Sequence, residues 1–341
     1  MKKHERLIER RRNQSFAGRG VRRLILTATS LLLAAVFVLV ACSAPQGPSG
    51  QSNAGQQSTA ADWKVVEQAL GKAGSMQPGD VYKVSLPRSD LKVTAGGVQL
   101  KPALALGSWV AFKKTGDMAM VMGDLVLTED EVTPVLTKLQ EGSVEQTALH
   151  NHVLRESPRV MYMHIHGMGD AVKIAKAIHD ALALSKTPFA APAAAGQNED
   201  IGIDTKQLDQ IMGQSGKVNG GVYQFSIPRA EEINDGPTAL DSKGPVVPPS
   251  MGVAQAINFQ STGGGKAAIT GDFVLIASEV NPVIRALREN GIEVTALHSH
   301  MLVESPRLFF MHFWANDEVQ KLARGLRAAL DKVNVVKAQA R

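Results

Sequence analysis

The sequence predicts an α+β protein built from two tandem ββαββα-like repeats whose antiparallel sheets share one core. Residues 63–185 align with residues 205–334, and Gly123-Asp-Leu-Val-Leu127 matches Gly271-Asp-Phe-Val-Leu275. From these segments to the second helix of each copy the offset is constant at 148 residues, without a gap. A repeat of this length indicates a duplicated structural unit. Because each half alone would leave one sheet face uncovered, we expect the two sheets to pack together.

Composition divides the chain into five segments. We expect a leader at 1–41, a flexible tether at 42–61, repeat one at 62–186, a linker at 187–204 and repeat two at 205–337. The tether is rich in Ser, Gln, Gly and Pro and has almost nothing to bury. The linker is rich in Ala, Pro, Gly and Asn, as connecting segments are.

The leader has the three parts of a secretory signal. Residues 1–23 contain nine Lys or Arg against two Glu, the apolar run 24–40 follows, and Leu39-Val-Ala-Cys42 ends it. This last tetrad resembles a bacterial lipobox. The resemblance implies that Cys42 becomes the diacylated first residue of an exported protein held at a membrane of the bacterial cell envelope. Cys42 is also the only cysteine of the chain, which excludes disulfides and thiolate metal sites.

Charge argues against a nucleic-acid partner. The whole chain has 37 Lys+Arg and 32 Asp+Glu, but the leader holds nine and two of these, which leaves 28 and 30 and a net charge near −2 for the rest. The basic character therefore belongs to the leader, and we expect no nucleic-acid binding.

The same elements are expected in the same order in both repeats. A short helix comes first, then a strand that ends in Pro-Arg, at 81–88 and 222–229. A two-strand hairpin follows, at 109–113 and 118–127 in the first copy, and then a helix. A second, histidine-bearing hairpin and a final helix complete each copy; in repeat two, apolar residues at 319, 322, 326, 329 and 333 follow one helical face.

Seven of the nine histidines lie in the second hairpin of each copy. The first copy reads Thr147-Ala-Leu-His-Asn-His-Val-Leu-Arg-Glu-Ser-Pro-Arg159, with His164 and His166 beyond. The second reads Thr295-Ala-Leu-His-Ser-His-Met-Leu-Val-Glu-Ser-Pro-Arg307, with His312 beyond. A fixed set of imidazoles is the feature best able to carry chemistry.

Strand geometry predicts how these imidazoles meet. Residues two apart share one face of a strand, so His150, His152 and Glu156 are expected on one face if the strand runs unbroken. With a turn centred on Pro158, His152 would oppose His164 and His150 would oppose His166. The same register in the second copy opposes His300 to His312 and His298 to Trp314, an indole that cannot bind metal.

Three histidines with an open position form the protein side of a catalytic zinc site. We therefore predict a divalent metal, with zinc the best fit, at His150, His152 and His164, and with His166 as a further candidate ligand. The second set is His298, His300 and His312. Glu156 and Glu304 are candidates for a further ligand, for a partner that fixes a histidine tautomer, or for the general base of a catalytic site.

Other interpretations of the same residues stay open. The histidines could be polar side chains on a solvated hairpin face, repeated because the domain was duplicated. Arg159 and Arg307 could bind an anionic ligand through their planar guanidinium groups. They could equally form turn-stabilising pairs with the nearby glutamates.

A family resemblance covers residues 63–334. The duplicated Ala-Leu-His-x-His-x-Leu-x-Glu-Ser-Pro-Arg core, the Gly-Asp-(Leu/Phe)-Val-Leu segment and the lipobox together resemble the LppY/LpqO group of bacterial lipoproteins. The resemblance implies an envelope location and a duplicated domain, and it implies no activity.

Two functional hypotheses follow. The first is an envelope lipoprotein that binds a divalent metal, with hydrolysis by a metal-bound water as the candidate activity. The second is a non-enzymatic envelope lipoprotein that uses its histidines and arginines to bind an anionic ligand or as a scaffold. The sequence has no Gly-x-Ser-x-Gly elbow and no dinucleotide fingerprint, which disfavours acyl-transfer and redox-cofactor enzymes. It identifies neither the envelope ligand nor a protein partner.

Overall fold

The structure is a computed structural model that describes residues 60–190, 200–238 and 241–337. The expected signal segment, Cys42 and nearly all of the expected tether lie outside these residues. The first helix begins at Ala60, two residues before the expected start of repeat one. Among the described residues, no helix is long and apolar enough to cross a membrane.

Repeat one forms a six-stranded antiparallel sheet of order β1-β2-β5-β6-β8-β7 and a small β3-β4 ribbon. Its elements are α1 (Ala60–Leu70), β1 (Ser75–Gln77), β2 (Val81–Pro87), β3 (Thr94–Ala95), β4 (Val98–Gln99), α2 (Pro102–Ala105), β5 (Gly107–Thr115), β6 (Met118–Thr128), α3 (Glu129–Glu141), β7 (Glu145–His150), β8 (Val160–Gly169) and α4 (Ala171–Leu182).

Repeat two forms a second six-stranded sheet of the corresponding order, β13-β14-β12-β11-β10-β9. Its elements are α5 (Thr205–Met212), β9 (Lys217–Asn219), β10 (Val222–Pro228), the 3-10 turn η1 (Pro249–Met251), β11 (Ala254–Gly263), β12 (Lys266–Leu275), α6 (Ala277–Glu289), β13 (Glu293–His298), β14 (Phe309–Glu318) and α7 (Val319–Leu330).

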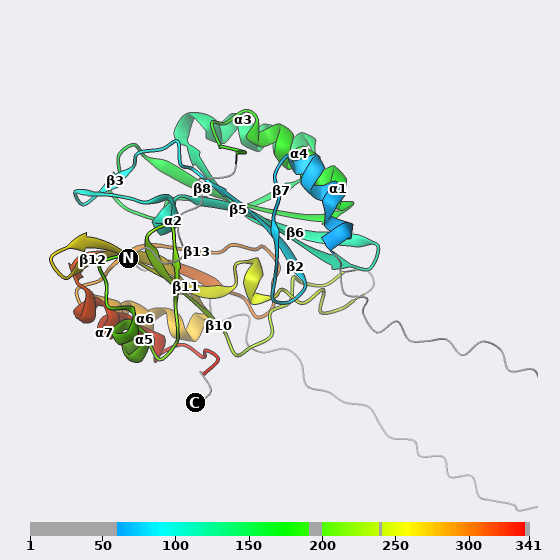
Figure 1. Cartoon of the computed structure of the whole chain (residues 1–341). Helices are drawn as coiled ribbons and strands as arrows, with labels where there is room; N and C mark the ends of the chain where they lie inside the picture. The colour runs from blue at the N-terminus through cyan, green and yellow to red at the C-terminus, as the bar shows by residue number, and fades with distance from the viewer. Residues whose placement is uncertain (1–59, 191–199, 239–240, 338–341) are drawn as a thin grey trace, which may run out of the picture. The chain divides into compact units, whose positions relative to one another are not determined.

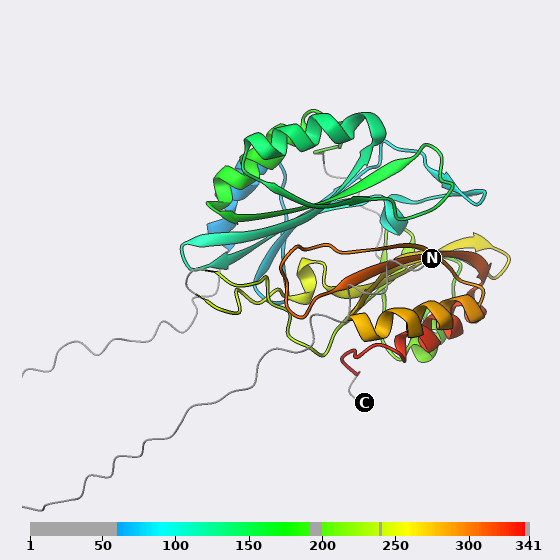
Figure 2. The ribbon, with the colours of Figure 1, turned by 180° about the vertical axis from the view of Figure 1, so that it is seen from behind.

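The two sheets pack against each other, and the helices cover their outer faces (Figure 1 and, from behind, Figure 2). Each sheet forms one hydrophobic core with its own helices. Two further buried clusters contain residues of both repeats: Val126 and Tyr162 with Ala268 and Trp314 in one, and Met122 with Phe310 in the other. The predicted α+β fold with two similar antiparallel repeats is confirmed.

The arginine that follows β2, and its counterpart after β10, account for the repeated Pro-Arg motif. Arg88 is fully buried after β2 and donates to Glu131 at 2.6 Å and to the Val126 carbonyl at 2.8 Å. Glu131 also accepts from the backbone of Thr128, where α3 begins. Repeat two has the same arrangement, with Arg229 donating to Glu279 at 2.6 Å. This ion pair fixes the start of the helix against the sheet.

The predicted register of the histidine hairpins is wrong. Strand β7 ends at His150, which opposes Tyr162, and His164 opposes Ala148. In repeat two His298 opposes Phe310, and His312 opposes Ala296. The pairing is centred on Glu156 rather than on Pro158, because an irregular loop replaces the expected strand up to Glu156. Bulges after Gln146 and Val294 move the pairing by one further residue beyond them.

Candidate metal centre

The histidines of the two hairpins meet where the two sheets face each other. The rings of His150 and His298 have centroids 3.5 Å apart, although they come from different repeats. Two more pairs join the repeats: His152 with His312 at 3.7 Å and His164 with His300 at 3.6 Å. Six imidazoles therefore form one cluster, which we call the histidine cluster: His150, His152, His164, His298, His300 and His312.

The sequence predicted two separate hairpin sites, and the structure corrects this. One group with ligand atoms within 4.8 Å of one another is the predicted set His150, His152 and His164. The other group contains the second predicted set, His298, His300 and His312, together with His150 of the first repeat. His150 thus belongs to both groups. The sequence could not show this convergence because it depends on how the two sheets pack.

His166 lies outside the histidine cluster. Its Nε2 is 2.7 Å from Asp235 and its Nδ1 is 3.3 Å from Glu145. These two carboxylates overcome the effect of burial and raise the pKa of His166 above its ordinary value. A histidine held by two carboxylates in this way joins the segment around Asp235 to the first repeat and is not in either group able to hold an ion.

Two aspartates that the sequence analysis did not single out lie beside the cluster. Asp124 on β6 is 4.0 Å from the Nε2 atoms of both His152 and His164. Asp272, at the matching place on β12, is 3.4 Å from His300 and 3.9 Å from His312. The sequence alone could have pointed to both aspartates, because each lies in a copy of the repeated Gly-Asp-(Leu/Phe)-Val-Leu segment.

Burial keeps the six imidazoles neutral. It lowers the pKa of every one of them, and for His298 the value falls to about 4. The pKa of His312 falls to about 3, through burial and then through the neighbouring His298. Neutral imidazole is the form that coordinates metal ions.

Burial has the opposite effect on the two carboxyl groups. It raises the pKa of Asp124 to about 8, even though the positive charge of Lys83 acts to lower it. Burial, and then the charge of Asp124, raise the pKa of Asp272 well above its ordinary range. Without a cation, the carboxyl group of Asp124 is therefore mostly protonated at neutral pH.

The cluster holds most of the unsatisfied polar atoms in the described part of the chain. Twelve buried side-chain nitrogen or oxygen atoms have no hydrogen-bond partner, and nine of them belong to the six histidines and two aspartates. Five histidines contribute Nε2, His150 contributes both ring nitrogens, and each aspartate contributes Oδ1. Buried polar groups are almost always paired, so a concentration of this kind points to an unseen ion or water.

Backbone carbonyls orient two of these rings. His312 Nδ1 is 2.8 Å from the Gly271 carbonyl, and His164 bonds to the backbone of Gly123. When Nδ1 donates to a carbonyl, the lone pair lies on Nε2, which in both residues is an unpartnered buried atom. This arrangement is typical of histidines that bind metal ions.

The glutamates of the Glu-Ser-Pro-Arg segments hold their own loops. Glu304 accepts from the backbone of Leu308 at 2.9 Å and from Arg307 at 3.0 Å. Glu156 accepts from the backbone of Val160 and Val153, and burial raises its pKa to about 7. Neither glutamate belongs to the two groups whose ligand atoms all lie within 4.8 Å of one another. The proposed base or ligand role of Glu156 and Glu304 stays a prediction.

The two arginines differ from each other. Arg307 donates to the carbonyls of Met301 and Leu302 and to Ser299, besides Glu304, so its guanidinium is engaged by its own loop. The Arg159 side chain is 67 % exposed and lies 3.7 Å from Glu129. The geometry of Arg307 matches the turn-stabilising interpretation, and an anion-binding role of Arg159 stays a prediction.

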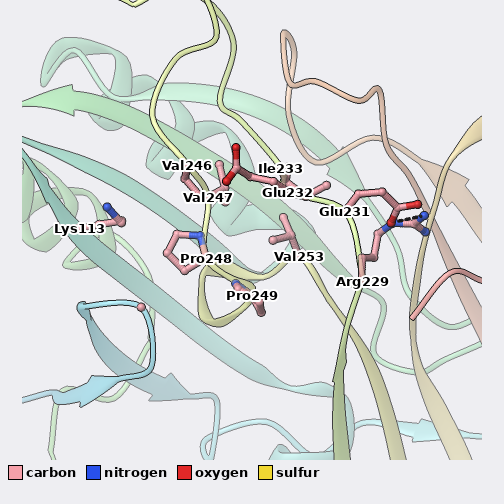
Figure 3. A pocket seen from close by; sticks show the side chains of 11 residues that line it. Lys113, Arg229, Glu231, Glu232, Ile233, Val246, Val247, Pro248, Pro249 and Val253 are labelled. Atoms are coloured by element: carbon pink, nitrogen blue, oxygen red, sulfur yellow. Dashed lines mark hydrogen bonds and ion pairs between the residues drawn. The ribbon is translucent and has the colours of Figure 1, made fainter. Parts of the chain in front are cut away.

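A cavity of about 380 Å³ lies apart from the histidine cluster (Figure 3). Its wall combines the loop residues Ile233, Val247 and Pro248 with Lys113 and the charged pair Arg229 and Glu231, which Figure 3 shows in contact. None of the six histidines lines it. Because the Arg229 guanidinium is satisfied by two glutamates, the cavity offers no free cation from that residue.

Comparison with known proteins identifies the repeated unit. A family model described as Domain of Unknown Function (DUF1259) matches residues 64–184 and again residues 206–332. The chain belongs to this family. The match establishes that the domain is duplicated. The description of the family model does not include the name LppY/LpqO.

The family assignment brings no activity, and no curated protein matches the chain. Among solved structures, a trimeric bacterial microcompartment shell protein, PduB, is 11 % identical with a TM-score of 0.22, covering 78 % of this chain and 96 % of that one. EtuB from Clostridium kluyveri is 9 % identical with a TM-score of 0.19, covering 76 % and 90 %. Likeness this low carries no argument about fold or function.

Proposed function

We propose that this member of the DUF1259 family binds divalent transition-metal ions at the histidine cluster between its two repeats. The single observation that supports this most strongly is the concentration of unpartnered buried nitrogen and oxygen atoms on six histidines and two aspartates. Leaving one buried polar group unpaired costs about 1–3 kcal/mol, so nine unpartnered atoms in one place favour a bound ion that pairs with them.

The ligand types favour ions that suit imidazole. Zinc, copper and nickel accept imidazole nitrogen, whereas calcium and magnesium prefer all-oxygen sites. Zinc is our first choice because three histidines with one further position match its usual coordination. With several histidines per ion, copper and nickel are the direct competitors.

A more specific hypothesis is that the metal site catalyses hydrolysis. It requires a group that takes a proton from a metal-bound water. Asp124 and Asp272 lie closest to the histidines that would hold the ion, so they replace Glu156 and Glu304 as our first candidates for that group. The alternative, an envelope scaffold that binds anions, would use the exposed Arg159.

Calorimetric titration of the purified, metal-free protein with Zn²⁺, Cu²⁺, Ni²⁺ and Mn²⁺ tests the proposal. We expect stoichiometric binding of at least one of the first three ions and much weaker binding of Mn²⁺. Absence of stoichiometric binding of any of these ions would leave the non-metal alternative as the better account.

Two variants localise the binding. His152→Ala removes a histidine of the first group, and we expect at least a tenfold loss of affinity or the loss of a bound ion. His166→Gln is the matched control, because it lies on the same hairpin but bonds to Asp235 and Glu145. If the control lost metal as severely as His152→Ala, the histidine cluster would not be the site.

We also propose that the protein is exported and held at a membrane of the cell envelope through lipid on Cys42. The support is the basic leader, the apolar run and the Leu-Val-Ala-Cys tetrad. Intact-mass analysis of the membrane fraction should show a mature chain that begins at Cys42 and carries lipid. Cys42→Ala should accumulate as precursor or appear as soluble protein; a wild-type mature chain without lipid would contradict the proposal.

A further inference from the structure

The histidine cluster consists of two equivalent triads related by the duplication. In the first, the ring of His150 lies 5.0 Å from that of His152 and 5.1 Å from that of His164. In the second, the ring of His298 lies 4.9 Å from both His300 and His312. The distances from the central ring to its two partners therefore agree between the triads to within 0.2 Å, and the two outer rings of the second triad, His300 and His312, are 6.5 Å apart.

These spacings match those of histidines that share one ion. A ligating nitrogen lies about 2.1 Å from zinc and its ring centre about 1.1 Å farther, so two rings at a tetrahedral angle have centres about 5 Å apart. The rings that pair across the repeats are closer, at 3.5 to 3.7 Å, which is a stacking distance. Shared coordination thus fits the spacings around His150 and around His298 better than it fits the stacked pairs. Across the repeats, His150 and His312 are 5.4 Å apart, in line with the place of His150 in both groups.

Each triad also has its own carboxyl group. The 4.0 Å from Asp124 oxygens to the Nε2 atoms of His152 and His164 is too long for a hydrogen bond. Asp272 lies 3.4 Å from His300 in the second triad. Neither aspartate belongs to the groups whose ligand atoms all lie within 4.8 Å of one another, so each carboxyl group lies beside its triad. Oδ1 of each aspartate is unpartnered and buried.

We infer that the site is dinuclear: one ion is held by His150, His152 and His164 beside Asp124, and a second by His298, His300 and His312 beside Asp272. His150 belongs to both groups of possible ligands, so we expect the two ions to be neighbours. Two-metal centres have their ions about 3.5–4 Å apart. This inference rests on the proposed metal binding and adds its stoichiometry and its division between the repeats.

Metal content per chain tests the inference. Metal-free protein is equilibrated with excess Zn²⁺, freed of unbound metal by gel filtration, and analysed for zinc. We expect two ions per chain in the wild type and in His166→Gln. We expect one ion in His152→Ala and one in His300→Ala, because each variant breaks a single triad.

The outcomes separate the two proposals. One ion in the wild type overturns the dinuclear site but keeps metal binding, whereas no ion overturns the proposed function as well. Two ions in both single variants would place the metal elsewhere and overturn both. If a variant failed to fold, as judged by circular dichroism, His152→Gln and His300→Gln would replace it, and the wild-type count stands without any variant.

A separate measurement tests whether the two ions are neighbours. Loading with Cu²⁺ should give an ordinary paramagnetic resonance signal at one equivalent, and this signal should broaden or fall as a second equivalent enters within about 4 Å. In His300→Ala the first equivalent of Cu²⁺ should give the ordinary signal, and a second equivalent should no longer broaden or reduce it. Two independent, unbroadened copper signals in the wild type would contradict neighbouring ions.

Discussion

The carboxyl groups of Asp124 and Asp272 control how the site responds to pH. The imidazoles are already neutral in the metal-free fold, and the pKa of His298, for example, lies at about 4. Protons therefore do not compete for these imidazoles at pH 6.5, the ordinary pKa of an exposed imidazole. The pKa of Asp124 is about 8, so a bound ion must displace a proton from this carboxyl group at neutral pH.

We predict that metal affinity rises with pH up to about 8 and that the aspartates set this slope. Below the pKa of a displaced group, affinity falls about tenfold per pH unit for each proton released. Asp124→Asn removes one such group, so the slope should decrease by about one proton. Calorimetry in buffers of different ionisation enthalpy counts the protons released on binding. If Asp124→Asn still lost metal affinity steeply between pH 7 and 6, the pH dependence would come from the histidines.

Lys83 makes the two triads electrostatically unequal. Its ammonium group lies 3.9 Å from the Trp109 ring centre and bonds to the Ser250 carbonyl, and its charge acts on Asp124. Repeat two has Gln224 at the matching position of its Val-Tyr-x-(Val/Phe)-Ser strand. The first triad therefore faces a cation that the second one lacks.

We predict that Lys83→Gln, which copies the residue of repeat two, strengthens ion binding at the first triad. Removing a nearby positive charge should raise that affinity several-fold, because the attraction between the ion and Asp124 is no longer opposed. Zinc titration of His300→Ala with and without Lys83→Gln isolates the first triad. An unchanged affinity would mean that Lys83 is too well shielded to matter.

At the scale of elements, buried ion pairs hold strand ends to helix starts. The Arg88 side chain has no exposure, and Glu131 bonds to it, to the first turn of α3 and to the backbone of Lys186. Removing one partner of such a pair leaves a buried charge unmatched.

Arg88→Ala should lower the free energy of unfolding by about 3–5 kcal/mol. The matched control on the same helix is Lys138→Ala, which breaks an exposed pair with Glu141 and should leave the free energy of unfolding almost unchanged. Urea unfolding followed by circular dichroism measures both. Equal, small effects would mean that the Arg88 pair contributes no more than a surface pair.

The elements themselves could be predicted because the sequence patterns are local. The Gly-Asp segments, the Pro-Arg strand ends and the order of helices and hairpins all follow from the aligned copies. The hairpin register could not be predicted, since an irregular loop replaces a turn centred on Pro158 and Glu156 leaves the strand to bond its own loop, so that His150 opposes Tyr162 instead of His166. The one-residue bulge after Gln146 has no reliable sequence signal either, because no glycine marks it.

At the scale of the whole molecule, the two repeats depend on each other. Val126 and Tyr162 pack in one cluster with Ala268 and Trp314 of the other repeat, and the Thr295 hydroxyl donates to the His152 carbonyl at 2.5 Å. Arg155 and Glu293 form a further cross-repeat ion pair at 2.6 Å. This dependence is also why the sequence alone gave separate histidine sites: no local pattern encodes how two sheets pack.

Repeat one alone should therefore be unable to form the native fold. Residues 62–186 would expose the sheet face that Ala268, Trp314 and Phe310 cover, at about 25 cal/mol for each Å² of apolar surface. We expect no cooperative thermal transition comparable to that of the whole chain, and aggregation at micromolar concentration. A melting temperature within a few degrees of the intact protein would contradict the shared core.

Anomalous diffraction from crystals of the zinc-loaded protein can locate the proposed metal site between the repeats. We expect strong anomalous density among the six histidines, bounded by Asp124 on one side and Asp272 on the other, with ligands from both hairpins. Zinc-loaded crystals without density at that place, or with zinc bound only at His166 or at other surface residues, would contradict it.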